Sequence, residues 1–329
     1  MKTVNIGIVG ATGLIGSTML KVMEENNIKV DKLKLFASLK SVGKEVKYLN
    51  KKYIIEKISE NSFSDLDFVL FSAGAEISRK YALIASKNAF VIDNSSFYRM
   101  NQECALIVPE INMDDYKNKS KIIANPNCST LCAILALSAL KKEFKILSIH
   151  YNTYQSVSGS GQKGINEYLN VLKGMKNDYY PYNISQTCIP HIDSFLLNSY
   201  TKEEMKMINE TRKILHDDTL KISATCVRVP VLYCHGVSVS VELDRDFDIN
   251  EIKKIFLNQE GLILYDDIKK NIYPNSIIAK DNNYVYIGRI RKDLARENSL
   301  LFYVVSDNTR RGAAYNAVKI MLNLIKLLK

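Results

Sequence analysis

The chain of 329 residues contains no apolar run that approaches the roughly 20 residues a membrane-spanning helix needs. Its first residues, MKTVNIGIVG, lead directly into a strand-like pattern and lack the layout of a signal peptide. These two absences predict a cytoplasmic protein that is not exported and has no membrane partner.

Paired cysteines are also missing. The six cysteines are scattered and form no CxxC pair: Cys104, Cys128, Cys132, Cys188, Cys226 and Cys234. No Cys/His spacing matches a zinc motif. We therefore expect thiols rather than a disulfide framework, and no metal site.

The chain lacks a basic arm, although 45 Lys and Arg against 35 Asp and Glu give a formal net charge of +10. Its lysines are spread through the sequence and mixed with acids, which favours a solvated surface over nucleic-acid binding. We expect no nucleic-acid partner. A positive field still suits anionic small molecules such as phosphates and nucleotides.

The length and the 47% hydrophobic content are sufficient for two domains with buried cores. In the first part, strands alternate with helices, which predicts a Rossmann-type doubly wound parallel sheet with helices on both faces. The expected strands are Val4–Val9, Leu33–Ala37, Phe68–Phe71 and Phe90–Ile92, with short apolar runs at Leu106–Val108 and Ile122–Ala124, and the expected helices are Leu14–Glu25 and Ile77–Ser86.

The middle of the chain has longer strands and fewer helices, which predicts an α+β domain with a mostly antiparallel or mixed sheet. Its expected strands are Lys145–Ser156, Ser223–Val229, Val237–Leu243, Tyr284–Arg289 and Leu300–Val305, and its helices are Leu131–Leu140, Gly164–Lys173 and Glu203–Leu215. An amphipathic helix, Ala313–Leu328, is expected to pack back on the first domain. Residues 1–127 with 309–329 are thus assigned to a nucleotide-binding domain and residues 128–308 to a second domain.

A glycine-rich turn, Gly10-Ala11-Thr12-Gly13-Leu14-Ile15-Gly16, joins the first strand to the first helix. Gly10 allows the tight turn, Gly13 lets the backbone approach a pyrophosphate, and Gly16 lets helix and strand pack closely. The N-terminus of the helix then offers free N–H groups to the phosphates. The spacing, GxxGxxG, predicts a dinucleotide site.

The residues after the second strand indicate which dinucleotide is bound. An NAD-binding chain usually places an acidic residue there for the ribose hydroxyls. This chain has Ser38 and Lys40 instead, a hydroxyl and a cation that suit a 2′-phosphate. The pattern predicts NADP as the cofactor.

Cys128 lies in Asn125-Pro126-Asn127-Cys128-Ser129-Thr130, immediately before an apolar helical run. An Asn in this place is a helix N-cap signal, so Cys128 is expected at a helix N-terminus. The dipole and N–H groups there favour a thiolate and can stabilise an oxyanion. We interpret Cys128 as a nucleophile and Cys132, one turn later, as a buried apolar residue.

A thiolate nucleophile needs a proton carrier. The chain has four histidines. His150 lies in a strand pattern and His216 late in a polar helix, so neither is favoured. Spacing alone leaves His191 and His235 open.

Several stretches together resemble the aspartate-semialdehyde dehydrogenase family along essentially the whole chain. These are GATGLIG, ASLKSVGK, VIDNSSFYR, ANPNCST, YQSVSGSGQKG, IPHID, KEEMKMINETRKIL, SATCVRVPV followed by a histidine, VYIGRIRKD and DNTRRGAAYNA. Any one of them is weak, but their joint occurrence in order is specific.

The resemblance implies a role for each matching position. Cys128 is similar to the family's nucleophile, His235 to its acid/base, and Gln155 to the residue that positions the substrate and supports the thiol. Arg228 matches the arginine that binds the substrate carboxylate, and Glu203 the residue that binds its amino group. Arg99 and Lys206 match the phosphate-binding cations. The positions that match cofactor-contacting residues are Thr12, Gly13, Leu14, Ile15, Ala37, Ser38, Ser158, Gly159 and Asn308. Gly10 of the glycine turn and Lys40 after the second strand are added to them as expected cofactor contacts.

The chain departs from the family's pattern in two places. Many members have Gly-His-Ser-Glu around the histidine, whereas this chain has Cys234-His235-Gly236-Val237. Lys40 replaces a frequent arginine and offers a point charge rather than a stacking plane.

The implied activity is the NADPH-dependent reductive dephosphorylation of L-aspartyl 4-phosphate to L-aspartate 4-semialdehyde through a thioester on Cys128. This step belongs to lysine, methionine and threonine biosynthesis. The implied partners are these substrates and phosphate, and the implied assembly is a homodimer or a dimer of dimers formed through the second domain.

Two alternative functions remain at this point. N-acetyl-glutamyl-phosphate reductase shares the nucleotide domain, the cysteine chemistry and an acyl-phosphate substrate, although the Arg228 to His235 arrangement and the EEMK stretch favour the aspartate enzyme. A non-catalytic Rossmann nucleotide sensor needs the glycine turn but not the pair Cys128 and His235.

Overall fold

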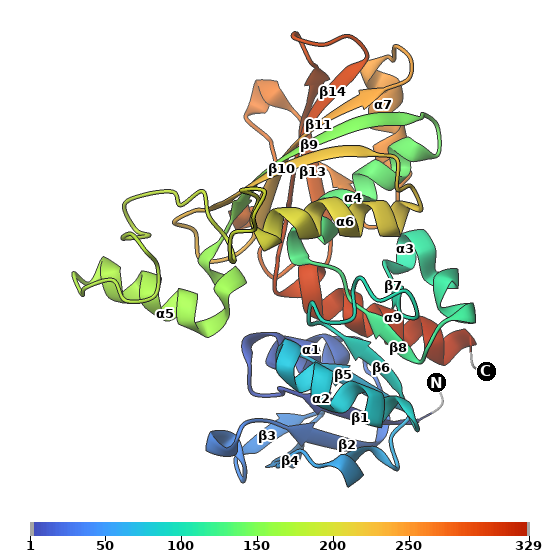
Figure 1. Ribbon diagram of the computed structural model, residues 1–329, viewed down its shortest axis with the longest axis vertical. Coiled ribbons are helices and arrows are strands. Elements are labelled where there is room, and N and C mark those ends of the chain that lie inside the picture. Colours follow the sequence, from blue (N-terminus) through green and yellow to red (C-terminus); the bar gives the residue numbers. More distant parts are fainter. Residues whose placement is uncertain (1–2, 328–329) are drawn as a thin grey trace. The chain divides into compact units, whose positions relative to one another are not determined.

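The computed structural model describes residues 3–327, which fall into two compact units (Figure 1). Unit 1 spans Met1–Pro126 and Ala313–Lys329, and unit 2 spans Asn127–Gly312. The predicted domain borders lie one residue and four residues away from these borders.

Unit 1 is built on an eight-stranded sheet in the order β3-β4-β2-β1-β5-β6-β8-β7. Its strands are β1 (Val4–Val9), β2 (Val30–Phe36), β3 (Glu45–Tyr48), β4 (Lys51–Glu56), β5 (Phe68–Phe71), β6 (Phe90–Asp93), β7 (Ala105–Leu106) and β8 (Ile122–Ala124). Every pairing is parallel except β3 with β4. The predicted doubly wound parallel sheet is confirmed.

The hairpin of β3 and β4 was not predicted from the sequence. It joins two lysine-rich strands through Leu49 and Asn50, which both have positive φ angles of 46° and 64°. Two-residue hairpin turns with positive φ angles usually contain Asn-Gly or Asp-Gly. The sequence Leu49-Asn50 contains neither pair, so the sequence analysis did not predict this hairpin.

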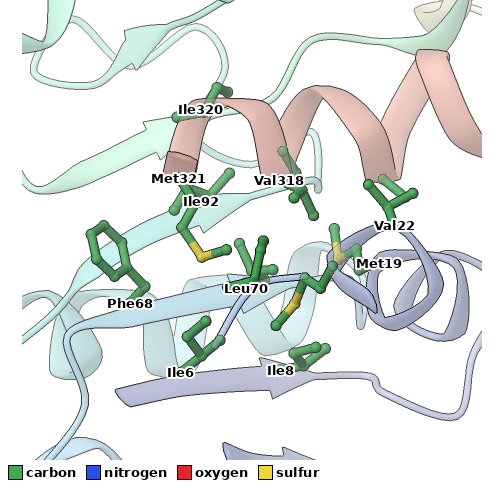
Figure 2. Packing of buried hydrophobic residues seen from close by; sticks show 14 of the residues in the cluster. Ile6, Ile8, Met19, Val22, Phe68, Leu70, Ile92, Val318, Ile320 and Met321 are labelled. Atoms are coloured by element: carbon green, nitrogen blue, oxygen red, sulfur yellow. The ribbon is translucent and has the colours of Figure 1, made fainter. Parts of the chain in front are cut away.

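Two helices bury their apolar sides against the same face of this sheet. Figure 2 shows Met19 and Val22 of α1 (Leu14–Glu25) and Val318 and Met321 of α9 (Tyr315–Leu327) packed over the sheet residues Ile6, Ile8, Leu70 and Ile92. Neighbouring strand residues point to the opposite face, and α2 (Ala75–Ser86) contacts β5, β6 and β8.

The C-terminal helix therefore completes the core of unit 1, as the sequence predicted. It begins at Tyr315, after one π-helical turn at Arg310–Ala314. The predicted last residue, Leu328, lies outside the described residues.

Unit 2 is built on a six-stranded mixed sheet in the order β10-β9-β11-β14-β13-β12. The strands are β9 (Ile146–Gln155), β10 (Lys221–Arg228), β11 (His235–Leu243), β12 (Leu262–Leu264), β13 (Val285–Lys292) and β14 (Ser299–Ser306). β9 pairs parallel with β10 and β12 pairs parallel with β13, and the remaining pairings are antiparallel. The predicted mixed sheet is confirmed.

The helices of unit 2 position the site on this sheet. α4 (Cys128–Lys141) contacts β9, β11 and β14, and α6 (Lys202–Leu215) lies beside α4 and contacts β10 (Figure 1). The remaining helices of the chain are α3 (Pro109–Asn112) in unit 1 and α5 (Gly161–Leu172), α7 (Ile249–Leu257) and α8 (Ser276–Ala279) in unit 2.

The helices within residues 3–327 include none that combines the length and the apolar character needed to cross a bilayer.

Replacing Gly16 by alanine tests the packing of the glycine turn. A Cβ atom at this position would lie 2.2 Å from the carbonyl oxygen of Gly10 and 2.8 Å from Cα of Ala11. Because both contacts are backbone, we expect Gly16→Ala to lower the free energy of unfolding by about 1–3 kcal/mol in urea titrations followed by circular dichroism. Ser17→Ala, at the next and exposed position, is the control and should change it by less than about 0.5 kcal/mol. Equal stability of the two variants would contradict the close approach.

Candidate active site

The ends of four strands gather polar side chains at one edge of the sheet in unit 2. β9 ends at Gln155, β10 ends at Arg228, and the two residues are register partners in parallel strands. β11 runs in the opposite direction and begins at His235, which pairs with Ser306 at the end of β14. The topology therefore brings Gln155, Arg228 and His235 to the same edge.

Cys128 is the first residue of α4, as the capping signal predicted. The side chain of Asn127 accepts hydrogen bonds from the backbone N–H groups of Ser129 at 2.9 Å and Thr130 at 3.4 Å. The helix is buried from Ser129 to Leu140, whereas Cys128 itself is half-buried. The N-terminus of a central helix thus presents the thiol at a place that a small substrate can reach.

Two buried carboxylates of α6 hold the cap of this helix. The backbone N–H of Asn127 donates to Oε2 of Glu210 at 2.6 Å, and its side-chain Nδ2 donates to Oε1 of Glu203 at 2.9 Å. The backbone N–H, the side-chain Nδ2 and the side-chain Oδ1 of Asn127 thus each have a hydrogen-bond partner. These bonds fix the position of the residue directly before Cys128.

Glu203 is also bound to two other predicted site residues. Nε2 of Gln155 donates to its Oε1 at 3.3 Å, and Nζ of Lys206 lies 3.0 Å from its Oε2. Burial disfavours the charged carboxylate, but Lys206, Asn127 and Arg228 outweigh burial and hold the pKa of Glu203 below its usual value. The structure thus brings Glu203, Gln155 and Lys206 together.

Lys206 has a second carboxylate partner. Its Nζ lies 2.9 Å from Oδ2 of Asp193, in the loop before α6. Burial opposes the ammonium charge, but Glu203 and Asp193 raise the pKa of Lys206 above its usual value. Lys206 is a permanent cation, and an anionic ligand would compete with Asp193 for it.

Arg228 is buried, and one of its guanidinium N–H donors has no hydrogen-bond partner. Its Nη1 donates to the carbonyl oxygen of Ser156 at 2.7 Å, whereas its buried Nε has no hydrogen-bond partner. A Cβ atom on Gly159 would lie 2.6 Å from Nη1 of Arg228 and 3.0 Å from Nε2 of His235. Gly159 therefore lies directly against both groups, where no larger residue has room.

His235 is fully buried, and only one of its two ring nitrogens, Nδ1, has hydrogen-bond partners. Its Nδ1 accepts the backbone N–H of Ser156 at 3.1 Å and lies 3.1 Å from Oγ of the same residue. Its Nε2 is buried without a hydrogen-bond partner. Burial first, and then the charge of Arg228, lower the pKa of His235 to about 3, so the ring is neutral at ordinary pH.

Asn308 organises the loop beneath His235. Its Oδ1 accepts hydrogen bonds from Oγ of Ser156 at 3.2 Å, Oγ of Ser158 at 3.1 Å and the backbone N–H of Cys234 at 2.9 Å. Two predicted cofactor-contacting residues, Ser158 and Asn308, are thus bound to each other, while Gly159 is exposed.

The unusual neighbours of His235 have a steric explanation. Cys234 has φ of +73°, a left-handed backbone region that favours glycine. A Cβ atom on Gly236 would lie 2.0 Å from Oη of Tyr303, so any larger residue at 236 requires the tyrosine side chain to move. The structure shows no reason for a cysteine at 234.

The other histidines lie outside this cluster. His150 binds Ser223 on neighbouring strands, and His191 stacks on Phe195 with ring centroids 4.2 Å apart. His216 is the left-handed C-cap of α6. Geometry therefore favours His235 over His191, the choice that spacing left open.

In unit 1, the glycine turn forms a cradle with no room for side chains. Gly10 has φ of +90°, and a Cβ there would lie 2.9 Å from backbone atoms of Ser72. Gly13 is the N-cap of α1, and its own Cβ would meet the carbonyl oxygen of Gly10 at 3.3 Å. Thr12 is exposed, and Leu14 and Ile15 are half-buried in the first turn. The backbone N–H groups at this helix start fit a pyrophosphate.

The loop after β2 lies against this turn. The N–H groups of Gly10 and Ala11 donate to the carbonyl oxygen of Phe36, and Oγ1 of Thr12 donates to Oγ of Ser41 at 3.3 Å. Ala37 is half-buried, while Ser38 and Lys40 are exposed. Both polar side chains are available to a ligand in the turn.

Arg99 also belongs to unit 1 and is buried near two strand ends. Its Nε donates to the carbonyl oxygen of Asn125 at 2.9 Å and its Nη2 to that of Asn94 at 3.1 Å. These contacts orient the guanidinium by backbone atoms beyond β6 and β8, at the carboxyl edge of the parallel sheet.

The sequence missed the residues that hold the site in place. Asp193 and Ser156 bind the predicted site residues Lys206 and His235, and Glu210 binds the cap residue Asn127. All three lie in stretches that carry the family resemblance, but no role was assigned to them. A buried glutamate in a helix pattern, such as Glu210, was the one available signal, because acids are rarely buried without a partner.

Within residues 3–327, no three His, Cys, Asp or Glu side chains are grouped so that they hold a metal ion.

Comparison with protein-family models identifies both halves of the chain. Residues 5–119 match a model described as "Semialdehyde dehydrogenase, NAD binding domain", and residues 137–311 match one described as "Semialdehyde dehydrogenase, dimerisation domain". Together they cover most of the sequence.

Similar proteins are aspartate-semialdehyde dehydrogenases. The enzyme of Aquifex aeolicus is 44% identical over 98% of both chains, and that of Helicobacter pylori strain J99 is 42% identical over 99% of both. The crystal structure of aspartate semialdehyde dehydrogenase II from Vibrio cholerae superposes with a TM-score of 0.94 at 38% identity, over 99% of both chains. A second structure of that enzyme is a complex with ASA.

The neutral state of His235 predicts a loss of stability in acid. Its pKa falls from 6.5 when exposed to about 3 in the folded protein, so the unfolded chain binds more protons below pH 6.5. This contribution to stability is complete above that pH and is lost as the pH falls toward 3. Between roughly pH 7 and pH 5 we expect wild type to lose about 2 kcal/mol more free energy of unfolding than His235→Gln, measured by urea titration. Parallel losses in both proteins would show that His235 titrates normally.

Proposed function

The chain belongs to the aspartate-semialdehyde dehydrogenase family, and from this premise we propose that it converts L-aspartyl 4-phosphate to L-aspartate 4-semialdehyde, and the reverse, with NADP as cofactor. The observation that carries the proposal is the position of Cys128 at the capped N-terminus of α4, in the unit whose sheet edge holds Arg228 and His235. The product serves lysine, methionine and threonine biosynthesis.

Cys128 is the nucleophile. In the reductive direction its thiolate attacks the acyl carbon, phosphate leaves, and a thioester remains on Sγ. The cofactor supplies the hydride that reduces this thioester. The resulting oxyanion collapses to the aldehyde and restores the thiolate, while the positive end of the α4 dipole and the ring of His235 stabilise the negative charge. The covalent step divides one difficult displacement into two easier ones.

The substrate's charged groups find matching side chains. Arg228 binds the carboxylate, because a buried guanidinium with an unused Nε needs an anion. Glu203 binds the amino group, with Gln155 beside it. Arg99 and Lys206 bind the phosphate, and Lys206 exchanges Asp193 for it.

The glycine cradle binds the pyrophosphate of the cofactor, and Ser38 and Lys40 bind the 2′-phosphate. The match to an NAD-binding domain model supports a nicotinamide cofactor in this unit. The remaining proposed contacts of the cofactor are Ser158, Gly159 and Asn308.

Unit 2 also carries the assembly surface. The match to a dimerisation-domain model supports a homodimer or a dimer of dimers. Large exposed apolar side chains gather in the segment after α5, including Tyr179, Tyr182, Phe195 and Leu197. A monomer rarely leaves such side chains uncovered in one region.

A phosphate-dependent assay tests the reaction. We expect purified protein to form NADPH from aspartate semialdehyde, NADP and phosphate, followed by absorbance, and to stop when phosphate is omitted. Cys128→Ala should lower kcat by about 10⁴-fold or more, because the covalent route is lost. Cys188→Ala, which removes an exposed thiol, is the matched control and should retain the wild-type rate.

A near-normal rate in Cys128→Ala would disprove the nucleophile. Phosphate-dependent turnover of N-acetyl-glutamate semialdehyde, with none of aspartate semialdehyde, would transfer the assignment to the acetyl-glutamyl enzyme.

Cofactor selectivity tests the loop after β2. Removing a cation that binds the 2′-phosphate should raise KM for NADP by about 5- to 30-fold in Lys40→Ala and leave KM for NAD unchanged. Lys44→Ala, another exposed lysine just beyond this loop, is the control. An equal change with both cofactors, or none with either, would show that Lys40 does not select the phosphate.

A further inference from the structure

Lys206 binds two carboxylates that differ in burial. Its Nζ lies 3.0 Å from Oε2 of Glu203, which is buried one turn earlier on α6, and 2.9 Å from Oδ2 of Asp193. The side chain of Asp193 is 37% exposed, whereas that of Glu203 is 6% exposed. The ammonium group is therefore shared between a buried anion and an anion at the protein surface.

The surface carboxylate exceeds what the charge of Lys206 requires. One ammonium group and two carboxylates together have a formal net charge of −1. Glu203 and Lys206 are neutral as a pair, and a largely buried pair of this kind is strongly destabilised only when one of its members is removed. Asp193 can leave Nζ without leaving Glu203 or Lys206 unpaired.

The backbone around Asp193 holds its carboxylate in place beside Lys206. Asp193 has φ of +68°, and its Oδ1 accepts the backbone N–H of Ser194 at 2.8 Å. The carbonyl oxygen of Ser194 in turn accepts the N–H of Lys202, the first residue of α6, at 2.9 Å. A carboxylate tethered in this way competes for Nζ like a ligand at about millimolar concentration or more.

We propose that Asp193 is an internal competitor of phosphate at Lys206: its carboxylate occupies the ammonium group while no phosphate is bound and so lowers the affinity of the site for free phosphate. This inference rests on the proposed function for the role of Lys206 as a phosphate-binding cation. One anion replaces another on Nζ, Glu203 stays bound, and no covalent bond changes.

Charge explains why phosphate and Asp193 exclude each other. A phosphate group carries about −1.5 to −2 charge at pH 7. With Asp193 in place it meets three side chains whose net charge is already negative, whereas with Asp193 displaced it meets the neutral pair of Lys206 and Glu203. Lys202 also attracts Asp193, so the displaced carboxylate still faces a cation.

The exchange sets the apparent affinity for phosphate. A ligand that binds only the fraction of molecules with a free site has its dissociation constant raised by the inverse of that fraction. In the reductive direction phosphate is the product, and a carboxylate that returns to Lys206 opposes its rebinding. The aspartyl substrate is also held through its carboxylate and amino groups, so it depends less on Lys206 than free phosphate does.

Kinetics of three variants test the competition. Asp193→Asn removes the charge but keeps an oxygen that accepts the N–H of Ser194. We expect it to lower KM for phosphate about 2- to 5-fold, the range for the loss of one partly exposed ion pair, and to leave KM for aspartate semialdehyde within about twofold. Asp193→Glu keeps the carboxylate and should keep the wild-type KM for phosphate. Asp218→Asn, which removes an exposed carboxylate between α6 and β10, is the matched control and should change neither KM.

The pattern across these variants decides the proposal. An unchanged or raised KM for phosphate in Asp193→Asn would overturn it, and so would an equal fall in Asp218→Asn. An equal fall in Asp193→Glu would assign the effect to the shape of the loop and would also overturn it.

A titration with inorganic phosphate, without substrate or cofactor, separates this inference from the proposed reaction. An anion that binds the folded protein raises its Tm, and potassium chloride at matched ionic strength corrects for screening. We expect half of the rise at a phosphate concentration about 2- to 5-fold lower in Asp193→Asn than in wild type. Identical titrations would refute the competition. Failure of wild type to turn over aspartate semialdehyde, with the expected difference between the titrations, would refute the proposed function alone.

Discussion

The capping of α4 by Asn127 is the interaction on which the site depends. One side chain satisfies the first N–H groups of the helix, and the same residue is bound by Glu203 and Glu210 of α6. The orientation of Cys128, the position of α6 and the environment of Glu203 are therefore set together. A helix N-terminus that is buried without such a cap would leave several donors unsatisfied.

The buried charged groups around Glu203 are held by polar and oppositely charged partners. Glu203 is held by Lys206, Asn127 and Gln155, and Lys206 also by Asp193. A charged ligand can replace one member of such an ion pair, because the buried charge that remains then still has an oppositely charged partner. Nε of Arg228 and Nε2 of His235 are among the buried atoms without a hydrogen-bond partner, and a bound ligand that supplies a partner to such an atom removes an unfavourable free-energy term.

Glycines decide how close the reactive groups come. Gly159 lies directly against Arg228 and His235, and Gly312 lies so near Cys128 that a Cβ atom added to it would be 3.0 Å from the Cβ atom of the cysteine. In unit 1 Gly10 and Gly16 bring the helix start against the strand. In each case the lack of a side chain on the glycine permits a close approach that a Cβ atom would prevent.

The sequence by itself determined the fold class, the glycine turn and the place of Cys128, because these depend on local signals: alternating strands and helices, a GxxGxxG spacing and an Asn before an apolar helix. A family resemblance added the site residues beyond these. The same resemblance singled out His235 over His191. Only the tertiary structure showed Ser156 bound to His235 and to Asn308, and paired Asp193 with Lys206. Such contacts join residues up to 152 positions apart, and no local pattern specifies a hydrogen bond across that separation. The hairpin at Leu49 and Asn50 was missed for the related reason that its turn lacks the usual residues.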